Sequence, residues 1–172
     1  MRNPRPSRKA SVSAGAQPSS RLSQDLRERY RQYFPRVFAY VYGRIRDSQA
    51  TEDLTSEVFR KAFAKADALS DEGVFEIWLF TVARDLLVSH CHGQSPRAAT
   101  PEGDLLQRPD LARLLDHLRH LRLREQDIIA LKFDAQLTNA QIAQVMQLTE
   151  SNVGVILYRT LRKLRKALEQ EP

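Results

Sequence analysis

Apolar side chains recur every three or four residues along most of this chain, which is the spacing of an amphipathic helix that faces a core. The first stripe comprises Leu26, Tyr30, Tyr33, Phe34, Val37, Phe38, Val41 and Ile45. Pro35 interrupts it, and a proline inside a helix either kinks that helix or starts a new one. No stretch alternates apolar and polar residues as a half-buried strand does, so the pattern predicts an all-α protein.

Two more helices are predicted in the same half of the chain. Asp47 and Ser48 are suited to cap the first of them, because their side-chain oxygens can accept hydrogen bonds from free backbone N–H groups. Its inward face consists of Leu54, Val58, Phe59 and Phe63. The other helix begins after Ser70 and Gly73. Its inward face consists of Phe75, Trp78, Leu79, Val82 and Leu86. We therefore expect residues 21–92 to form one small helical domain.

A helix-turn-helix pattern lies near the carboxyl end. Its predicted helices are Leu123–Phe133, Thr138–Met146 and Thr149–Leu168. Thr138 and Gln141 have the spacing of a capping box at the start of the middle helix. The inward face of that helix consists of Ile142, Val145 and Met146. A short helix, a tight turn and a longer basic helix can place the last helix in the major groove of DNA.

The last predicted helix has two distinct faces. Its apolar stripe consists of Val153, Leu157, Leu161, Leu164 and Leu168. The opposite face carries Tyr158, Arg159, Arg162, Lys163, Arg165 and Lys166. Gly154 and Val155 occupy the exposed first turn, where a DNA-recognition helix normally shows polar or basic side chains.

The segments that flank these patterns differ in composition. Residues 1–20 contain no acidic residue, are rich in Ser, Pro and Ala, and carry Arg2, Arg5, Arg8 and Lys9. We expect a disordered basic tail, which either attracts phosphates weakly or is inert. Residues 93–109 break the helical pattern with Gly, Pro, Ser and Thr and are expected to form a flexible linker. Residues 110–170 then form a second small helical domain, which contains the helix-turn-helix.

The composition narrows the class of protein. Of 172 residues, 42% are hydrophobic, which is enough to fill compact cores, and Lys and Arg outnumber Asp and Glu by 27 to 21. The net charge of +6 suits a polyanionic partner such as nucleic acid. The single cysteine excludes an intramolecular disulfide and is compatible with a reducing cytosol. No apolar run reaches membrane-spanning length and no signal peptide is recognisable, so we expect a soluble cytoplasmic protein.

No catalytic residue and no metal site are expected. The chain has no Gly-rich phosphate loop, no nucleophile motif and no paired carboxylates in an obvious pocket, which disfavours an enzyme, and no cofactor is expected. His90, Cys91 and His92 are of residue types that bind metal ions. However, adjacent residues on a helix point in different directions, and no second ligand pair has zinc spacing. His117 and His120 lie beyond the linker. We interpret the cluster as polar residues at a helix end.

Three motifs carry a family resemblance. They are Thr51-Glu-Asp-Leu-Thr-Ser-Glu-Val-Phe59, Phe75-Glu-Ile-Trp-Leu-Phe-Thr-Val-Ala-Arg84 and Leu123-Arg-Glu-Gln-Asp-Ile-Ile-Ala-Leu131. In this order, with a linker before the third, they resemble bacterial sigma factors of the extracytoplasmic-function (ECF) group, subunits of RNA polymerase. The resemblance covers roughly residues 30–168. Each motif alone is weak, whereas their ordered combination is specific.

The resemblance implies that the first motif docks on core RNA polymerase, through the clamp helices of its largest subunit. The matching residues are Glu52, Asp53, Ser56 and Glu57. Acidic side chains are poor DNA ligands, so this face of a basic protein suits a protein partner. The alternative is an ordinary solvated helix face. The family typically has Gln at the position of Ser56, which implies an altered contact.

The second motif corresponds to the part of the family that captures the melted non-template strand of the promoter. This task requires a pocket for an extruded base and positive charge for the phosphates. By the match, Thr81, Arg84 and Asp85 lie nearest that pocket, whereas Trp78 belongs to the core. The family usually has Asn at the position of Asp85 and a basic run after His90. A carboxylate beside a phosphate strand is unfavourable, so we expect weaker or differently selective strand capture.

The last helix corresponds to the part that recognises the distal promoter element. The matching residues are Gly154, Val155, Tyr158, Arg159 and Arg162, followed by Lys163 and Lys166. The two arginines suit guanine edges or phosphates, the two lysines suit phosphates, and Val155 and Tyr158 suit thymine methyl groups. Relatives often have Lys or Arg at the position of Gly154. The alternative is a helical hairpin that packs only for stability.

The leading hypothesis is therefore a sigma factor that binds core RNA polymerase and promoter DNA and helps to melt that DNA, with an anti-sigma factor as a further candidate partner. Asp85, Gly154 and the missing basic run motivate a second hypothesis, a sigma-like decoy that engages an anti-sigma factor without starting transcription. A third is a stand-alone helix-turn-helix regulator, although no dimerisation stripe of the kind that such proteins use is evident.

Overall fold

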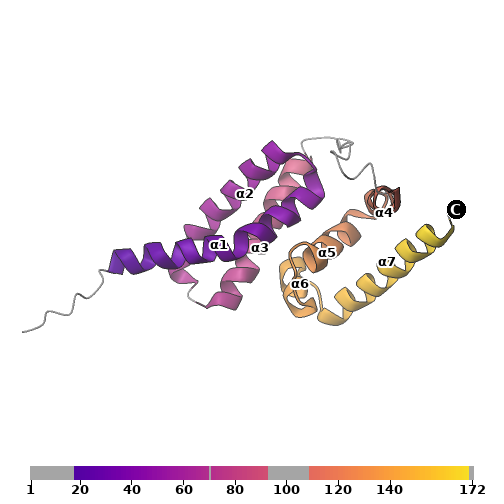
Figure 1. Cartoon of the computed structure of the whole chain (residues 1–172). Coiled ribbons are helices and arrows are strands. Elements are labelled where there is room, and N and C mark those ends of the chain that lie inside the picture. Colours follow the sequence, from indigo (N-terminus) through magenta and orange to yellow (C-terminus); the bar gives the residue numbers. More distant parts are fainter. Residues whose placement is uncertain (1–17, 70, 93–108, 171–172) are drawn as a thin grey trace, which may run out of the picture.

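The computed structural model describes residues 18–69, 71–92 and 109–170, which are all helices, short turns and loops, without a strand. The α-helices are α1 (Pro18–Ile45), α2 (Ser48–Phe63), α3 (Glu72–His92), α4 (Pro109–Arg119), α5 (Leu123–Phe133), α6 (Asn139–Met146) and α7 (Glu150–Gln170). A single 3₁₀ turn, Ala66–Ala68, follows α2. The predicted all-α fold is confirmed (Figure 1).

Helices α1, α2 and α3 form an amino-terminal unit in which α2 packs against both of the others. Helix α1 continues through Pro35 as one element, so this proline does not start a new helix. The predicted cap of α2 is confirmed, because the Asp47 carboxylate accepts a hydrogen bond from the backbone N–H of Ala50 at 2.8 Å. Most of the predicted tail and linker, residues 1–17 and 93–108, lies outside the described residues.

Helices α4 to α7 form a carboxyl-terminal unit, in which α7 packs against α4, α5 and α6. The predicted capping box is present. The Thr138 hydroxyl accepts from the backbone N–H of Gln141 at 3.2 Å, and the Gln141 side-chain oxygen accepts from the backbone N–H of Thr138 at 2.8 Å. Gln147 closes α6 in the left-handed conformation, with φ of 54°, which makes the tight turn into α7.

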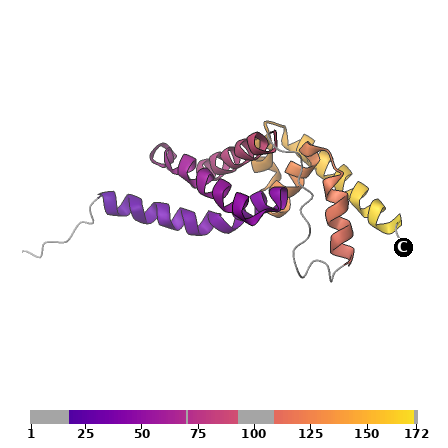
Figure 2. The same cartoon turned by 90° about the horizontal axis from the view of Figure 1, so that it is seen from above.

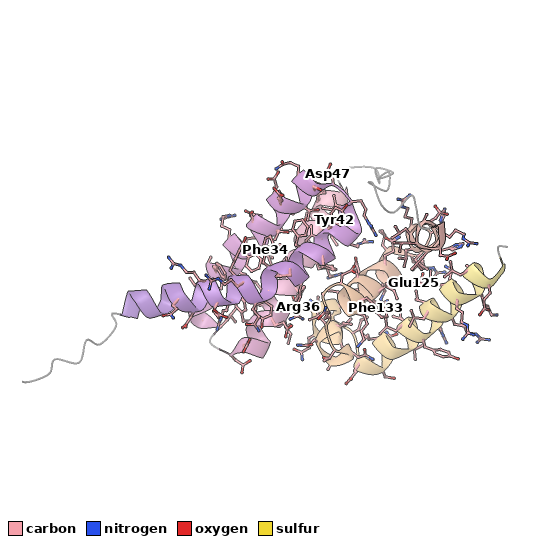
Figure 3. All side chains as sticks on the ribbon, in the orientation of Figure 1. Phe34, Arg36, Tyr42, Asp47, Glu125 and Phe133 are labelled. Atoms are coloured by element: carbon pink, nitrogen blue, oxygen red, sulfur yellow. The ribbon has the colours of Figure 1, made fainter. Side chains whose placement is uncertain are left out.

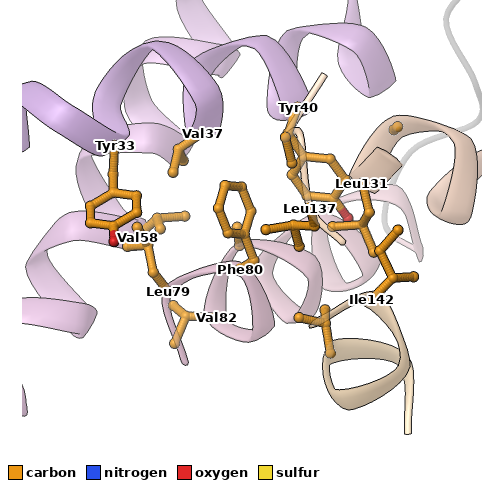
Figure 4. Close-up of a cluster of buried hydrophobic side chains, with 14 of the residues drawn as sticks. Tyr33, Val37, Tyr40, Val58, Leu79, Phe80, Val82, Leu131, Leu137 and Ile142 are labelled. Atoms are coloured by element: carbon orange, nitrogen blue, oxygen red, sulfur yellow. The ribbon is translucent and has the colours of Figure 1, made fainter. Parts of the chain in front are cut away.

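The two units share one buried cluster (Figure 4). Tyr40 of α1 and Phe80 of α3 are fully buried, with ring centroids 6.1 Å apart. Leu131, Leu137 and Ile142 of the carboxyl-terminal unit are buried beside them. Helices α5 and α6 contact the amino-terminal unit through α1 and α3, while the carboxyl end of α7 points away from it in both views (Figures 1 and 2).

Two residues predicted to face the core are exposed instead. Leu161 is 43% exposed, because the buried face of α7 follows Val153, Leu157, Thr160 and Leu164, and Thr160 takes the inward position that a strict four-residue spacing assigns to Leu161. Tyr30 is 41% exposed. Its ring lies at the edge of the amino-terminal unit and packs on Phe34 and Phe59 at centroid distances of 5.1 and 4.7 Å.

Candidate nucleic-acid and protein interfaces

Helix α7 presents a basic face to solvent. Val153, Leu157, Thr160 and Leu164 anchor one side of the helix in the core. The opposite side exposes every residue predicted to recognise DNA, namely Val155, Tyr158, Arg159, Arg162, Lys163 and Lys166. Tyr158 is 67% exposed, which is unusual for a large aromatic ring without a partner surface. Such a face can contact DNA without moving the core of its own unit.

The charges on this face are not equally available. The Lys163 ammonium lies 4.0 Å from the Glu125 carboxylate of α5, and Arg165 pairs with Glu169 at 2.7 Å. Among the residues that the structure describes, Arg159 and Arg162 have no ion-pair or hydrogen-bond partner. These two arginines are therefore the cations best placed to bind an external anion.

Gly154 lies beside this face. Apart from its chain neighbours and its own helix backbone, no described atom lies within 4 Å of a Cβ atom added to Gly154, so the glycine is not required by packing. The structure therefore leaves room at this position for a larger side chain.

The predicted polymerase-docking face lies on α2. Glu52, Asp53 and Ser56 are exposed, and Glu57 is half-buried. Arg60 makes two hydrogen bonds to the Glu57 carboxylate, at 2.5 and 2.6 Å, and this contact lowers the pKa of Glu57. Helix α2 carries this face away from the carboxyl-terminal unit, since it packs on α1 and α3. Glu52 and Asp53 thus leave an acidic end open to a partner.

The predicted strand-capture residues on α3 do not converge on an open pocket. The Thr81 hydroxyl donates a hydrogen bond to the Ile77 carbonyl of its own helix at 2.8 Å, and Asp85 points to solvent with 70% of its side chain exposed. The Arg84 guanidinium lies between two carboxylates, 3.9 Å from Asp85 and 4.0 Å from Asp127 of α5. Arg84 is therefore held by acids in this arrangement.

Trp78 is partly buried against the core, in keeping with its predicted role. Its indole N–H meets no hydrogen-bond partner among the described residues, and the Lys65 ammonium lies 4.4 Å from the ring centroid. Such a cation–π contact holds the exposed side of the ring in place.

A first polar cluster joins the two units. Arg36 of α1 points toward the carboxyl-terminal unit (Figure 3), where its Nε donates to the Ala135 carbonyl at 2.8 Å. The same guanidinium pairs with Glu76 of α3 at 2.5 Å. The other oxygen of Glu76 accepts from the Gln141 amide of α6 at 2.6 Å. Gln141 thus caps α6 and links it to α3.

A second cluster centres on Asp127, which is only 7% exposed. One carboxylate oxygen lies 3.2 Å from Nε of Arg44, and the other lies 4.0 Å from Nε of Arg84. Arg44 also hydrogen-bonds the side chain of Gln126. Burial raises the pKa of the Asp127 carboxyl, and the two arginines oppose that rise only in part.

Sequence reasoning missed both clusters. Arg36, Glu76 and Arg44 looked like ordinary charged residues beside apolar stripes. One signal was present, because Asp127 directly precedes the buried Ile128 and lies on the inward side of α5. An acidic residue on a core-facing stripe indicates a buried partner.

The described residues contain no group of three or more His, Cys, Asp or Glu side chains arranged to hold a metal ion. The side chains of Cys91 and His92 lie outside the described part. Among the described helices, none combines the length and the apolar character needed to cross a membrane.

The Sigma-70 region 2 family matches residues 29–97, and the Sigma-70 region 4 family matches residues 117–166. The chain is 30% identical over 157 residues to the ECF RNA polymerase sigma factor BldN of Streptomyces coelicolor, covering 83% of this chain and 60% of the length of BldN.

Two solved structures are also similar. The sigma factor RpoE of Bartonella quintana, in complex with the anti-sigma factor NepR, has a TM-score of 0.70 and 18% identity, covering 87% of this chain and 99% of that one. An RsbN–BldN complex gives a TM-score of 0.36 and 28% identity, covering 86% of this chain and 96% of that one. With matches to both sigma-70 regions in the same order, and to BldN, the chain belongs to the ECF group of sigma-70 family RNA polymerase sigma factors.

Proposed function

We propose that this protein binds core RNA polymerase, directs it to promoters and helps to open the promoter DNA. The observation that carries the proposal is the pairing of two units with different faces. One unit has an acidic helix face at Glu52 and Asp53, and the other exposes Arg159 and Arg162 on a helix-turn-helix. A protein that must hold both a polymerase and DNA needs both kinds of surface.

The acidic face of α2 is the candidate contact with core polymerase, formed by Glu52, Asp53, Ser56 and Glu57. The internal pairing of Glu57 with Arg60 and Lys61 leaves Glu52 and Asp53 as the stronger contributors. Charge reversal at these two positions tests their role. The double variant Glu52→Lys, Asp53→Lys is expected to lose binding to core polymerase, whereas Glu150→Lys, at an exposed residue of α7, is not.

Promoter contacts are divided between two helices in this proposal. Helix α7 recognises the distal element through Val155, Tyr158, Arg159 and Arg162, with phosphate contacts from Lys163 and Lys166. Helix α3 holds the melted strand through Thr81, Arg84 and Asp85. In this proposal the polymerase carries out nucleotide joining, so the subunit itself is not an enzyme. The proposal also places the protein in the cytoplasm.

Run-off transcription of genomic DNA fragments with core polymerase tests the proposal. Adding the protein is expected to produce discrete transcripts that core polymerase alone does not make. If the protein neither bound core polymerase nor changed the transcripts, the proposed function would be wrong.

One observation favours a second candidate, a decoy that binds an anti-sigma factor without starting transcription. Asp85 is exposed beside Arg84, where it would repel the phosphates of a DNA strand. An anti-sigma factor is thus a candidate partner under either proposal. Promoter-dependent transcripts from the reconstituted holoenzyme would eliminate the decoy.

A further inference from the structure

We propose that Asp127 occupies, between Arg44 and Arg84, the place of a phosphate of the melted DNA strand, so that the packed arrangement of the two units is self-inhibited and Arg44 is a further strand-binding residue. We call this arrangement the closed form. The inference rests on the proposed function, because it takes Arg84 as a contact to single-stranded DNA.

The geometry around Asp127 is that of a small anion held by two cations. Each carboxylate oxygen faces a different arginine, one from α1 and one from α3, at 3.2 and 4.0 Å. A phosphate likewise offers several oxygens to separate guanidinium groups. Asp127 belongs to the carboxyl-terminal unit, so both arginines are released when the units separate.

The covered face has the composition of a single-strand binding surface. Arg44 and Arg84 supply two positive charges along α1 and α3, while Arg36 stays paired with Glu76 of its own unit, and the buried rings of Tyr40 and Phe80 pack against each other from these two helices. Surfaces that bind single strands combine basic side chains for the phosphates with aromatic rings on which bases stack. In the closed form, α5 and α6 cover this face.

The interface is poorly satisfied for a permanent core. Within the described part of the chain, the Tyr40 hydroxyl, Nε of Arg44 and Nε of Arg84 are all buried without a hydrogen bond, although nearly all buried polar groups in folded proteins are paired. The contact of Arg44 with Asp127 is close in distance but lacks hydrogen-bond geometry. Groups left in this state gain partners when a nucleic acid replaces the carboxyl-terminal unit.

The other two candidate surfaces remain open in the closed form. The acidic end of α2 and the basic face of α7 are exposed. Closure therefore blocks strand capture, without blocking a first encounter with polymerase or duplex DNA.

Charge reversal at Asp127 tests the inference with the full-length chain. In Asp127→Lys a third cation faces Arg44 and Arg84 and drives the units apart. The matched control is Asp116→Lys, which makes the same change in net charge at an exposed residue of α4. Fluorescence anisotropy with a labelled oligothymidylate of about 16 nucleotides measures strand binding. We expect Asp127→Lys to bind at least about fivefold more tightly than Asp116→Lys.

A reversible crosslink provides the opposite perturbation. A Cβ atom on Gly43 would lie 3.5 Å from Cγ of Asp134 across the interface, which is where the sulfur of a cysteine at position 134 would stand, so Gly43→Cys with Asp134→Cys is the pair to crosslink, and loss of free thiol on oxidation verifies that the disulfide forms. Cys91→Ser removes the native thiol. The oxidised protein is expected to bind the oligonucleotide at least about fivefold more weakly than the same protein after reduction.

The role of Arg44 is tested in the opened protein. Added to Asp127→Lys, Arg44→Ala is expected to weaken oligonucleotide binding more than Arg31→Ala, which removes an exposed arginine elsewhere on α1. In the oxidised crosslinked protein the two alanine substitutions should be equivalent, because the face is covered. Equal effects in the opened protein would remove Arg44 from the site.

Two outcomes separate this inference from the proposed function. If Asp127→Lys and Asp116→Lys bind the oligonucleotide equally, and oxidation of the crosslinked protein changes nothing, the inference is wrong even when the wild-type protein directs transcription. If the wild-type protein fails to bind core polymerase, the proposed function fails instead. Circular dichroism of each variant tests whether the helices are retained. If Asp127→Lys unfolds, the comparison of the oxidised and reduced crosslinked protein alone tests the inference.

Discussion

Replacing Gly154 with alanine separates the stability of the recognition helix from its function. Gly154 is the fifth residue of α7, and apart from its chain neighbours and its own helix backbone no described atom lies within 4 Å of an added Cβ atom. The substitution therefore neither fills a cavity nor creates a clash. Its effect on folding reduces to helix propensity, where alanine is favoured over glycine by about 0.8–1 kcal/mol.

This free energy converts to a measurable shift. In a protein of this size, 1 kcal/mol changes the Tm by about 2–4 °C, so Gly154→Ala is expected to raise the Tm by about that amount. Gly43→Ala is the matched control, because Gly43 is also helical but its Cβ atom would lie 2.6 Å from a carboxylate oxygen of Asp134. There the same gain in propensity is offset by displacement of a half-buried carboxylate.

Thermal unfolding followed by circular dichroism measures both variants, and run-off transcription measures Gly154→Ala. We expect a higher Tm for Gly154→Ala, a smaller rise or a fall for Gly43→Ala, and transcription by Gly154→Ala close to that of the wild type. A lower Tm for Gly154→Ala would refute the reasoning about space. A higher Tm with a large loss of transcription would show that DNA approaches the backbone at Gly154, which the propensity argument does not include.

Three further variants test other parts of the structure. Arg159→Ala is expected to weaken binding to the distal promoter element by about 1–3 kcal/mol and to reduce transcription more than Gly154→Ala does; equal losses on matched promoters would count against the assignment. Thr138→Ala removes the side-chain cap of α6 and should lower stability by about 1 kcal/mol, whereas Gln144→Ala, at an exposed position of the same helix, should change it by less than about 0.5 kcal/mol; similar Tm values for the two would exclude a capping role. Phe80→Ala empties a fully buried site and should cost about 3–5 kcal/mol in urea unfolding, against a small change for the half-exposed Val74→Ala; a loss below about 1 kcal/mol would mean that the site collapses on truncation.

Local features were predictable because their causes are local in the sequence. The capping box of α6 and the cap of α2 depend on residues three apart, such as Thr138 with Gln141 and Asp47 with Ala50. The exposed face of α7 follows from helical periodicity alone. Periodicity failed at Leu161, because two successive four-residue steps, from Val153 through Leu157, drift around the helix while the buried face alternates spacings of four and three.

Long-range features were not predictable from one sequence. Arg44 and Asp127 are 83 residues apart in the chain, and neither charge indicates which partner it meets until the fold brings them together. The packing of the two units was not predictable for the same reason. An amphipathic pattern can place Tyr40 and Phe80 in a core, but it does not indicate that residues of the carboxyl-terminal unit share that core. The residues of the candidate face on α3 were therefore predicted from the sequence, whereas the contact of that face with α5 was not.

The pairing of Asp127 with Arg44 and Arg84 affects how the proposed sigma factor is activated. A ligand shifts a conformational equilibrium only by the difference between its affinities for the two forms. Duplex DNA bound by Arg159 and Arg162 meets a face that is exposed in the closed form, so its binding to α7 alone does not favour opening. A melted strand that needs Arg44 and Arg84 binds only when Asp127 has left them. Opening of this protein and opening of the promoter are then coupled steps, and the same substitution that frees the two arginines should raise both single-strand affinity and the yield of open promoter complexes.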